Sequence, residues 1–473
     1  MLRDCLATEM PMRGARWAGA TAVLLLLLLW TGCGQTYRPV ATPILPNPPN
    51  PGFAHYVITI SDNGPDEAGS TTRIDTSGDS NVGVAQMGLS PVHAALLPNA
   101  TRAFVANSGD ATVSAYLPTL ITTIATISLP AGSVPVFVHT TENATVYVAN
   151  SGNNTVSAIN TAQDVVTNQI PVGVNPVALA ETPNGLQLYV ANQGNNGTGG
   201  SVSSINTIDR TVNPPIANSA WISPVWAVAR SDSQRVYVLD GGSGSVSAIN
   251  TASDTVVGTV SVGIGANFML YDSSRNRLYV TNPSTATGAN PDGQSLSIID
   301  ASSDALTVLA NVSFAPSTAV NAPCPAGCTP VSVAALPDGS RAYVASYVTS
   351  TCAGVPCIVS QVTVISALTN TISSEIALGS ANIDLTNPTG CSTARFRLST
   401  VASADSSRVY VAECDAGSTG IIATAANNSP GDNYGPDTLI VNMPAPLSAF
   451  PIPASNPGGA PPPQNPVFVL ASP

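Results

Sequence analysis

A short hairpin pattern recurs along this chain, and it constrains the fold more than any other feature. Its clearest copy spans residues 144–161, where the apolar stretch 146–149 leads into an Asn/Gly cluster and a second apolar stretch, 156–159, follows. Short β-branched runs on either side of such a cluster predict two antiparallel strands joined by a turn. The rest of the chain repeats this unit.

Eight strands that each begin with an aromatic residue can be aligned. They start at Tyr56, Phe104, Tyr147, Tyr189, Tyr237, Tyr279, Tyr343 and Tyr410. A proline-led strand precedes most of them, as in Pro91-Val92-His93 and Pro224-Val225-Trp226, and two further strands complete each period. The starts are 42 to 48 residues apart, except for two spacings of 64 and 67 near the end. Four short antiparallel strands in a period of about 43 residues predict the blade of a β-propeller.

A single blade cannot bury both faces of its sheet, so stacked blades must cover one another. We therefore expect an all-β chain, a β-propeller of four-stranded antiparallel blades. A right-handed β-solenoid is the alternative, although solenoid coils are usually shorter. Small and β-branched residues suit sheets that are buried on both faces.

The aromatic-led strands also carry a family resemblance. Tyr147-Val148-Ala149-Asn150, Tyr189-Val190-Ala191-Asn192 and Tyr279-Val280-Thr281-Asn282 resemble the YVTN β-propeller repeat, and the last of them is the motif itself. The resemblance covers nearly all of the chain from Tyr56 onward. It implies an exported or surface protein of bacteria, and some relatives resemble lactonase and quinoprotein propellers.

The C-terminus predicts how the ring closes. The segment 465–470 reads like the proline-led strand at 175–179, whereas the first blade, from Tyr56, lacks such a strand. Joining the two ends would leave no exposed sheet edge. We expect eight blades, with seven as the alternative because seven is common in the resembled family.

The N-terminus predicts export and a lipid anchor. Residues 1–33 read as a lipoprotein-type signal peptide, with an apolar run that ends at Trp30-Thr31-Gly32-Cys33 and Cys33 as the acylated residue. Trp30 departs from the usual leucine, so an ordinary signal peptide or an uncleaved anchor stays open. Residues 34–52 read as a Pro-rich tether, and residues 53–473 as one propeller domain.

Insertions between strands predict which face of the ring is functional. With strands lettered A to D from the axis outward, the A–B and C–D turns are short, as at Asp272-Ser273-Ser274. The expected B–C and D–A connections hold the long insertions, at 61–70, 193–200, 213–223, 283–294, 312–329, 346–360, 380–395 and 413–437. Ligands of propellers usually meet loops, so we expect the B–C/D–A face to bind. Neutral drift of tolerated loops is the alternative.

Six cysteines fall on that expected face, besides Cys5 and Cys33 near the N-terminus. An exported chain favours disulfides, and sequence proximity suggests Cys324–Cys328, Cys352–Cys357 and Cys391–Cys414. Zinc or haem is the alternative, but neither C-x-x-C nor C-x-x-C-H occurs.

Ionisable side chains suited to catalysis are scarce. Of three histidines, His93 and His139 lie on A strands of adjacent blades and share a parity, so they could face each other in the channel wall. Ordinary polar packing is the plainer interpretation. No G-x-S-x-G, H-E-x-x-H or phosphate-loop motif occurs. Asp/Asn/Gly strings such as 240–244 and 290–293 could ligate calcium, although turn chemistry explains them.

Composition limits the partners. The net charge is −12, and all fifteen basic residues are arginines, which excludes lysine-based mechanisms. Nucleic acid is a poor partner for such a chain. We expect a monomeric, envelope-anchored, non-catalytic propeller without a cofactor, held at the membrane by its lipid alone, that binds a protein or glycan. A propeller enzyme of lactonase or quinoprotein-dehydrogenase type and a surface-coat component remain alternatives.

Overall fold

The computed structural model describes residues 55–472, except for 65, 196, 217, 286–292, 319–323, 325, 384–390, 392–393, 396, 430–431 and 446–464. The expected signal peptide, Cys33 and the tether lie outside the described residues. Within the described part, no helix is long and apolar enough to cross a bilayer.

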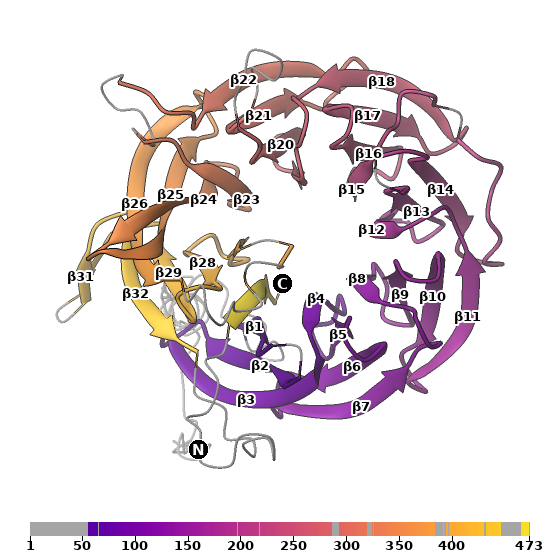
Figure 1. Cartoon of the computed structure of the whole chain (residues 1–473), viewed down its shortest axis with the longest axis horizontal. Coiled ribbons are helices and arrows are strands. Elements are labelled where there is room, and N and C mark those ends of the chain that lie inside the picture. The colour runs from indigo at the N-terminus through magenta and orange to yellow at the C-terminus, as the bar shows by residue number, and fades with distance from the viewer. Residues whose placement is uncertain are drawn as a thin grey trace, which may run out of the picture. The chain divides into compact units, whose positions relative to one another are not determined.

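The ring consists of eight antiparallel sheets arranged around a central channel (Figure 1). The strands are given from the channel outward. Blade 1 contains β33 (Asn465–Ala471), β1 (Tyr56–Asp62), β2 (Ala68–Asp75) and β3 (Ser80–Leu89), and blade 2 contains β4 (Pro91–Leu96), β5 (Ala103–Asn107), β6 (Thr112–Leu117) and β7 (Thr122–Ser128). Blade 3 contains β8 (Pro135–His139), β9 (Thr145–Asn150), β10 (Thr155–Asn160) and β11 (Val165–Pro171), and blade 4 contains β12 (Pro176–Glu181), β13 (Gln187–Asn192) and β14 (Ser201–Asn206).

Blades 5 to 8 follow the same order. Blade 5 contains β15 (Pro224–Ala229), β16 (Arg235–Asp240), β17 (Ser245–Asn250) and β18 (Thr255–Ser261), and blade 6 contains β19 (Phe268–Asp272), β20 (Arg277–Asn282), β21 (Ser295–Asp300) and β22 (Thr307–Ser313). Blade 7 contains β23 (Thr329–Ala335), β24 (Arg341–Cys352), β25 (Val355–Ser366) and β26 (Thr371–Asn382), and blade 8 contains β27 (Leu398–Ala402), β28 (Arg408–Glu413), β29 (Ser418–Ala423) and β32 (Thr438–Pro444).

The two ends of the chain close the ring as predicted. The C-terminal strand β33 pairs antiparallel with β1, with Thr59 opposite Val469, and so supplies the innermost strand of blade 1. The expectation of eight blades is confirmed. Because β33 comes from the opposite end of the chain, blade 1 forms only when both ends meet.

Blade 4 departs from the four-stranded pattern. Its fourth strand is reduced to a single bridge between Ile205 and Val212, so the sheet has three strands. Pro214 and Pro215 follow after Asn213, and proline cannot donate to a sheet ladder. Trp221 is instead buried between blades 4 and 5, and its indole N–H donates to Ser247 Oγ at 3.3 Å.

The aromatic residue that leads each B strand is the main core side chain of its blade. All eight rings are 0 to 2% exposed. Some tyrosines also reach the next blade, since Tyr237 donates its hydroxyl to the carbonyl of Ala301 at 2.9 Å. Burial raises the pKa of Tyr237 to about 12, so the hydroxyl keeps its proton as a donor.

The asparagine of the repeated motif links two strands of the same blade in blades 2, 3 and 4, whereas Asn282 in blade 6 donates to the carbonyls of Val262 and Ile264. Asn150 Nδ2 donates to the hydroxyls of Thr155 and Ser157, at 3.0 and 2.7 Å, and Asn107 and Asn192 do the same in their blades. The motif is thus explained by packing and hydrogen bonding within the fold.

The A–B/C–D face carries arginine bridges between neighbouring blades. Each arginine stands at or just before the start of a B strand and pairs with an aspartate in the C–D connection of the next blade. The pairs are Arg102–Asp164, Arg235–Asp304, Arg341–Asp437 and Arg408–Asp79. Short turns hold three of these aspartates in reach, whereas Asp437 ends a longer C–D connection in blade 8.

One insertion lies on the face that was expected to be trimmed. We predicted that residues 413–437 belong to the B–C/D–A face. Only the turn after Glu413 does so, because β28 and β29 are joined there, whereas 424–437 connects β29 to β32 and is therefore a C–D insertion. It holds a small hairpin of β30 (Asn427–Ser429) and β31 (Asp432–Tyr434).

Candidate functional site

The mouth of the central channel opens in the middle of the B–C/D–A face. The A strands begin there, and the residue after each leading proline is a valine in four successive blades. A cavity of about 390 Å³ is lined by Val92, Val136, Val177, Gln193, Val225, Asn267 and Arg395. The entrance is therefore a largely apolar funnel with two amides and one guanidinium.

An aromatic collar surrounds the channel one residue deeper. His93 stacks on Phe137 with ring centroids 3.9 Å apart and lies 4.3 Å from Phe468. Trp226 continues the series, 5.4 Å from Phe137 and 4.8 Å from Phe268. These rings come from five of the eight blades.

Arg395 reaches into the funnel from the D–A connection between blades 7 and 8. Its guanidinium donates to the carbonyls of Val177 and Val225, each at 2.6 Å, on blades 4 and 5. It also lies over the rings of Trp226 and Phe137, at 4.6 and 5.8 Å. Burial lowers the pKa of Arg395 to about 10, so the side chain stays charged at neutral pH.

The two channel histidines are both held neutral at physiological pH. Burial is the largest cause that lowers the pKa of His93 well below its usual value, followed by Arg395 and His139. Burial lowers the pKa of His139 to about 4. His93 Nδ1 accepts the backbone N–H of Val138 at 3.3 Å, so its own proton is on Nε2. The ring that packs on His93 belongs to Phe137 rather than to His139.

A second cavity, of about 250 Å³, adjoins the same guanidinium. Asp62, His93 and Arg395 line it together with Ser90, Ser108 and Phe468. Burial raises the pKa of Asp62, while the N–H of Gly64, which donates to its Oδ1 at 3.0 Å, opposes the rise. Three ionisable groups thus line one small cavity at the channel mouth.

The six cysteines form the three disulfides that proximity suggested. Cys324–Cys328 closes a turn in the D–A connection before β23, and Cys352–Cys357 joins β24 to β25. Cys391–Cys414 fastens the Arg395-bearing connection to the B–C turn of blade 8. All three lie on the B–C/D–A face.

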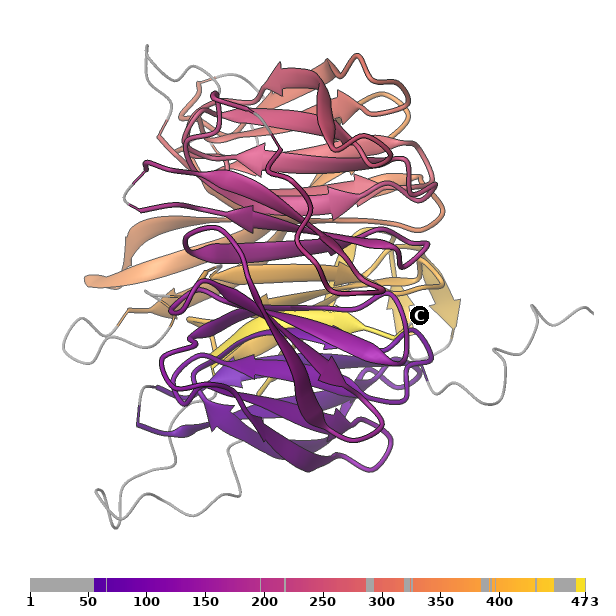
Figure 2. The same ribbon diagram turned by 90° about the vertical axis from the view of Figure 1, so that its right-hand side faces the viewer.

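Blade 7 extends beyond this face as paired strands. Residues 346–360 were expected to be a loop insertion, but β24 and β25 continue their ladder without a break to a two-residue turn at Ala353-Gly354. Both turn residues have positive φ, 49° and 85°, as the tightest hairpins require. Figure 2 shows this orange hairpin projecting past the ends of the other strands. The projection is a ribbon of defined register.

A buried carboxyl group lies beside the Cys391–Cys414 disulfide. Glu413 occupies the position of the motif asparagine in blade 8 and is 2% exposed, and its Oε1 accepts no hydrogen bond from any described residue. Gly420 replaces a hydroxyl residue of the other blades, and a Cβ there would lie 3.2 Å from that oxygen. Burial raises the pKa of Glu413 to about 7.

The Asp/Asn/Gly strings do not form metal sites within the described residues. Asp240 Oδ1 accepts the backbone N–H groups of Ser223, Gly242 and Ser243 at 2.9 to 3.0 Å, which is turn chemistry. Residues 290–292 lie outside the described residues. Among those described, no group of three or more His, Cys, Asp or Glu could hold a metal.

Sequence reasoning missed the collar and Arg395. The collar had a readable signal, since Pro91, Pro135, Pro224 and Pro466 are each followed two residues later by an aromatic or imidazole ring. Arg395 had none, because its carbonyl partners lie 170 and 218 residues away in sequence.

No protein-family model matches the chain, and no curated protein matches it. Solved structures with the same kind of fold include the hydrazine synthase of Kuenenia stuttgartiensis, 18% identical over 66% of this chain and 87% of that one, with a TM-score of 0.48. The Cps50 (Swd1) β-propeller domain of Myceliophteria thermophila is 8% identical over 71% and 97%, with a TM-score of 0.49.

A putative 6-phosphogluconolactonase from Bacteroides fragilis is 11% identical over 89% of this chain and 99% of that one, with a TM-score of 0.47. Sequence identities this low indicate a similar fold and nothing more, and these TM-scores support no inference about function.

Proposed function

We propose that this chain is an exported, lipid-anchored propeller of the YVTN type that binds a partner through its B–C/D–A face. Cys33 carries the anchor, residues 34–52 form the tether, and the ring acts as a monomeric scaffold in the bacterial cell envelope. The observation that carries the proposal is the concentration of all three disulfides on one face, around the channel mouth. Disulfides are typical of exported proteins.

The projecting hairpin of blade 7 supports a protein partner ahead of a glycan. Its inner strand pairs with β23 only as far as Tyr347, so residues 348–352 have β25 on one side and no described strand on the other. This stretch contains no charged residue and no proline, the usual devices that block pairing at an edge. An extended peptide could therefore add to it through backbone hydrogen bonds.

The test uses two variants, each of which lacks the projecting hairpin on one face of the ring. Residues 348–359 are replaced by a two-residue Asn-Gly turn, and the matched control shortens the C–D insertion of blade 8, which contains β30 and β31. The full chain, in neutral detergent, is crosslinked in envelope extract and also applied to a glycan array. We expect saturable crosslinking to a defined protein that the first deletion removes and the second leaves intact. Equal recovery with both deletions would overturn the proposal, and binding to glycans alone would shift it to that class.

A propeller hydrolase is the second candidate, because Asp62, His93 and Arg395 line one cavity. It ranks lower because Arg395 is engaged by two backbone carbonyls and neutral His93 is packed between two rings. A panel of simple lactones tests it. Hydrolysis by the wild type that Asp62→Asn abolishes, without loss of the folded state, would place this candidate first.

A further inference from the structure

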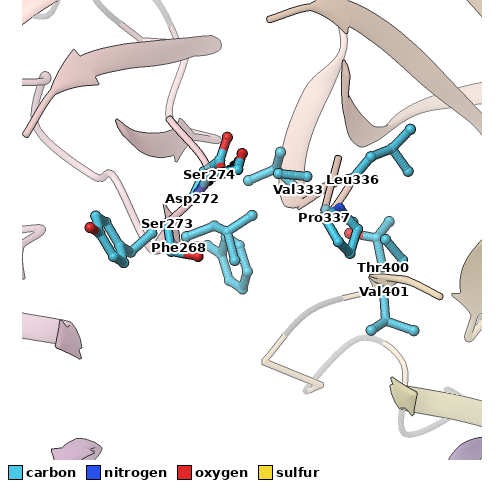
Figure 3. A pocket seen from close by; sticks show the side chains of 14 residues that line it. Phe268, Asp272, Ser273, Ser274, Val333, Leu336, Pro337, Thr400 and Val401 are labelled. Carbon is cyan, nitrogen blue, oxygen red and sulfur yellow. Dashed lines mark hydrogen bonds between the residues drawn. The ribbon is translucent and has the colours of Figure 1, made fainter. Parts of the chain in front are cut away.

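A separate cavity lies at the opposite end of the channel, near the A–B turns. Its volume is about 350 Å³, within the range of small-molecule sites. The walls come from the length of β19 in blade 6 and from the last residues of β23 and β27 in blades 7 and 8, and Figure 3 shows them facing one another across the opening. Phe268, Leu336 and Val401 contribute apolar surface, and Asp272 contributes a carboxylate.

Asp272 occupies a position where blades 2 and 7 have a leucine and blades 4, 5 and 8 have Thr182, Arg230 and Ser403. In blades 2 and 7 the backbone N–H at this position donates to the carbonyl five residues on, at or just before the start of the B strand. Leu97 and Leu336 stand there, 3% and 1% exposed. Asp272 is 6% exposed, so blade 6 has a buried acid at the position where blades 2 and 7 have a buried leucine.

Only one oxygen of this acid is satisfied within the described structure. Oδ1 accepts the N–H and the hydroxyl of Ser274, at 2.9 and 2.5 Å. Oδ2 is buried and has no hydrogen-bond partner among the described residues, and no ion pair there includes Asp272. Burying a carboxylate oxygen that accepts no hydrogen bond lowers the stability of the folded protein. A ligand that supplies a charged donor would remove that cost.

From this arrangement we propose that the A–B end of the channel binds a small organic cation, a primary ammonium on a short apolar body, with Asp272 as its counter-ion. The ammonium donates to Asp272 Oδ2. The apolar body lies against Phe268, Leu336 and Val401, and aromatic walls favour a cation further. A metal ion fits less well, because one carboxylate supplies few of the oxygen ligands that such ions need.

The experiment titrates trifluorobutylammonium ion into the full chain in neutral detergent and follows ¹⁹F NMR line broadening. Trifluorobutanol is the uncharged comparison probe. We expect saturable binding of the ammonium and at least about tenfold weaker binding of the alcohol. Asp272→Asn, which keeps the shape of the side chain and its bond to Ser274, should weaken ammonium binding by at least about tenfold.

Two further variants make the outcome decisive. Asp209→Asn changes an exposed aspartate that forms a similar turn on blade 4, and it should bind like the wild type. Ala402→Leu fills the cavity without touching Asp272 and should abolish binding. Wild-type affinity in Asp272→Asn, equal affinity for the alcohol, or no binding of either probe by the wild type would each overturn the proposal.

Discussion

Glu413 illustrates how one substitution in a repeated motif changes the chemistry of a site. In blades 2, 3 and 4 the amide donates to two hydroxyls, whereas in blade 8 a carboxyl group replaces it beside Gly420. The pKa of Glu413 in the folded protein, about 7, is above the ordinary glutamate value of 4.5, which represents the unfolded chain. Between these pH values the unfolded chain releases its proton first, so folding stability falls as pH rises through this window.

We therefore predict that Glu413→Gln stabilises the protein at pH 8 and leaves stability at pH 4 nearly unchanged. The gain at pH 8 is at most about 3 kcal/mol, from 1.36 kcal/mol per pKa unit. Urea unfolding at the two pH values measures it. A gain of the same size at pH 4 would show that shape rather than ionisation is responsible.

Arg395 is expected to stabilise the ring across the channel. Replacing it with methionine keeps the apolar stem, removes two charge-assisted hydrogen bonds and leaves two carbonyls without this donor. We predict a loss of about 2 to 4 kcal/mol in the free energy of unfolding. Arg235→Met, which breaks an ion pair with a half-exposed aspartate on the other face, should cost about 1 kcal/mol or less. Equal losses would contradict the bridging role.

At the scale of the element, the motif asparagine joins the second and third strands of a blade. Asn150→Ala removes both bonds to Thr155 and Ser157 and leaves the hydroxyls without that donor. We predict a loss of about 1 to 3 kcal/mol by thermal unfolding. Gln163→Ala, an exposed turn residue of the same blade, should change stability by less than about 0.5 kcal/mol. A neutral Asn150→Ala variant would contradict this account of the motif.

Elements were predicted unevenly from sequence, for physical reasons. The B strands could be predicted because an aromatic residue with β-branched neighbours is typical of one kind of element, a buried β-strand. The β24–β25 extension was mistaken for a loop because serine, threonine and glycine are common to loops and exposed strands. The missing fourth strand of blade 4 was also unforeseen, although Pro214-Pro215 signalled it.

At the scale of the whole molecule, stability depends on the closure by β33. Val469 is 2% exposed and packs with Val57 and Tyr410, which joins blade 1 to blade 8. We predict that Val469→Asn destabilises the whole ring by about 2 to 4 kcal/mol and broadens the unfolding transition. Val441→Asn, on the half-exposed outer strand β32, should cost less than about 1 kcal/mol. An effect confined to blade 1 in hydrogen exchange would contradict closure as a global constraint.

The proposed lipid anchor also belongs to the scale of the whole molecule. We predict that radiolabelled palmitate is incorporated into the full chain and that Cys33→Ala abolishes the label. Cys5→Ala should leave it unchanged. Persistent labelling of the Cys33 variant would rule out this residue as the anchor.

The sequence by itself determined the propeller, the closure of the ring by the C-terminal strand and the pairing of the cysteines. These depend on periodic burial and on short separations along the chain, both of which are visible in one dimension. The tertiary structure alone decided that Arg395 crosses the channel, that Asp272 lies in an apolar wall and that the insertion after Ala423 is on the opposite face. Each depends on which blades meet around the axis, and residues that meet there are separated by long stretches of chain whose spacing carries no sign of the contact.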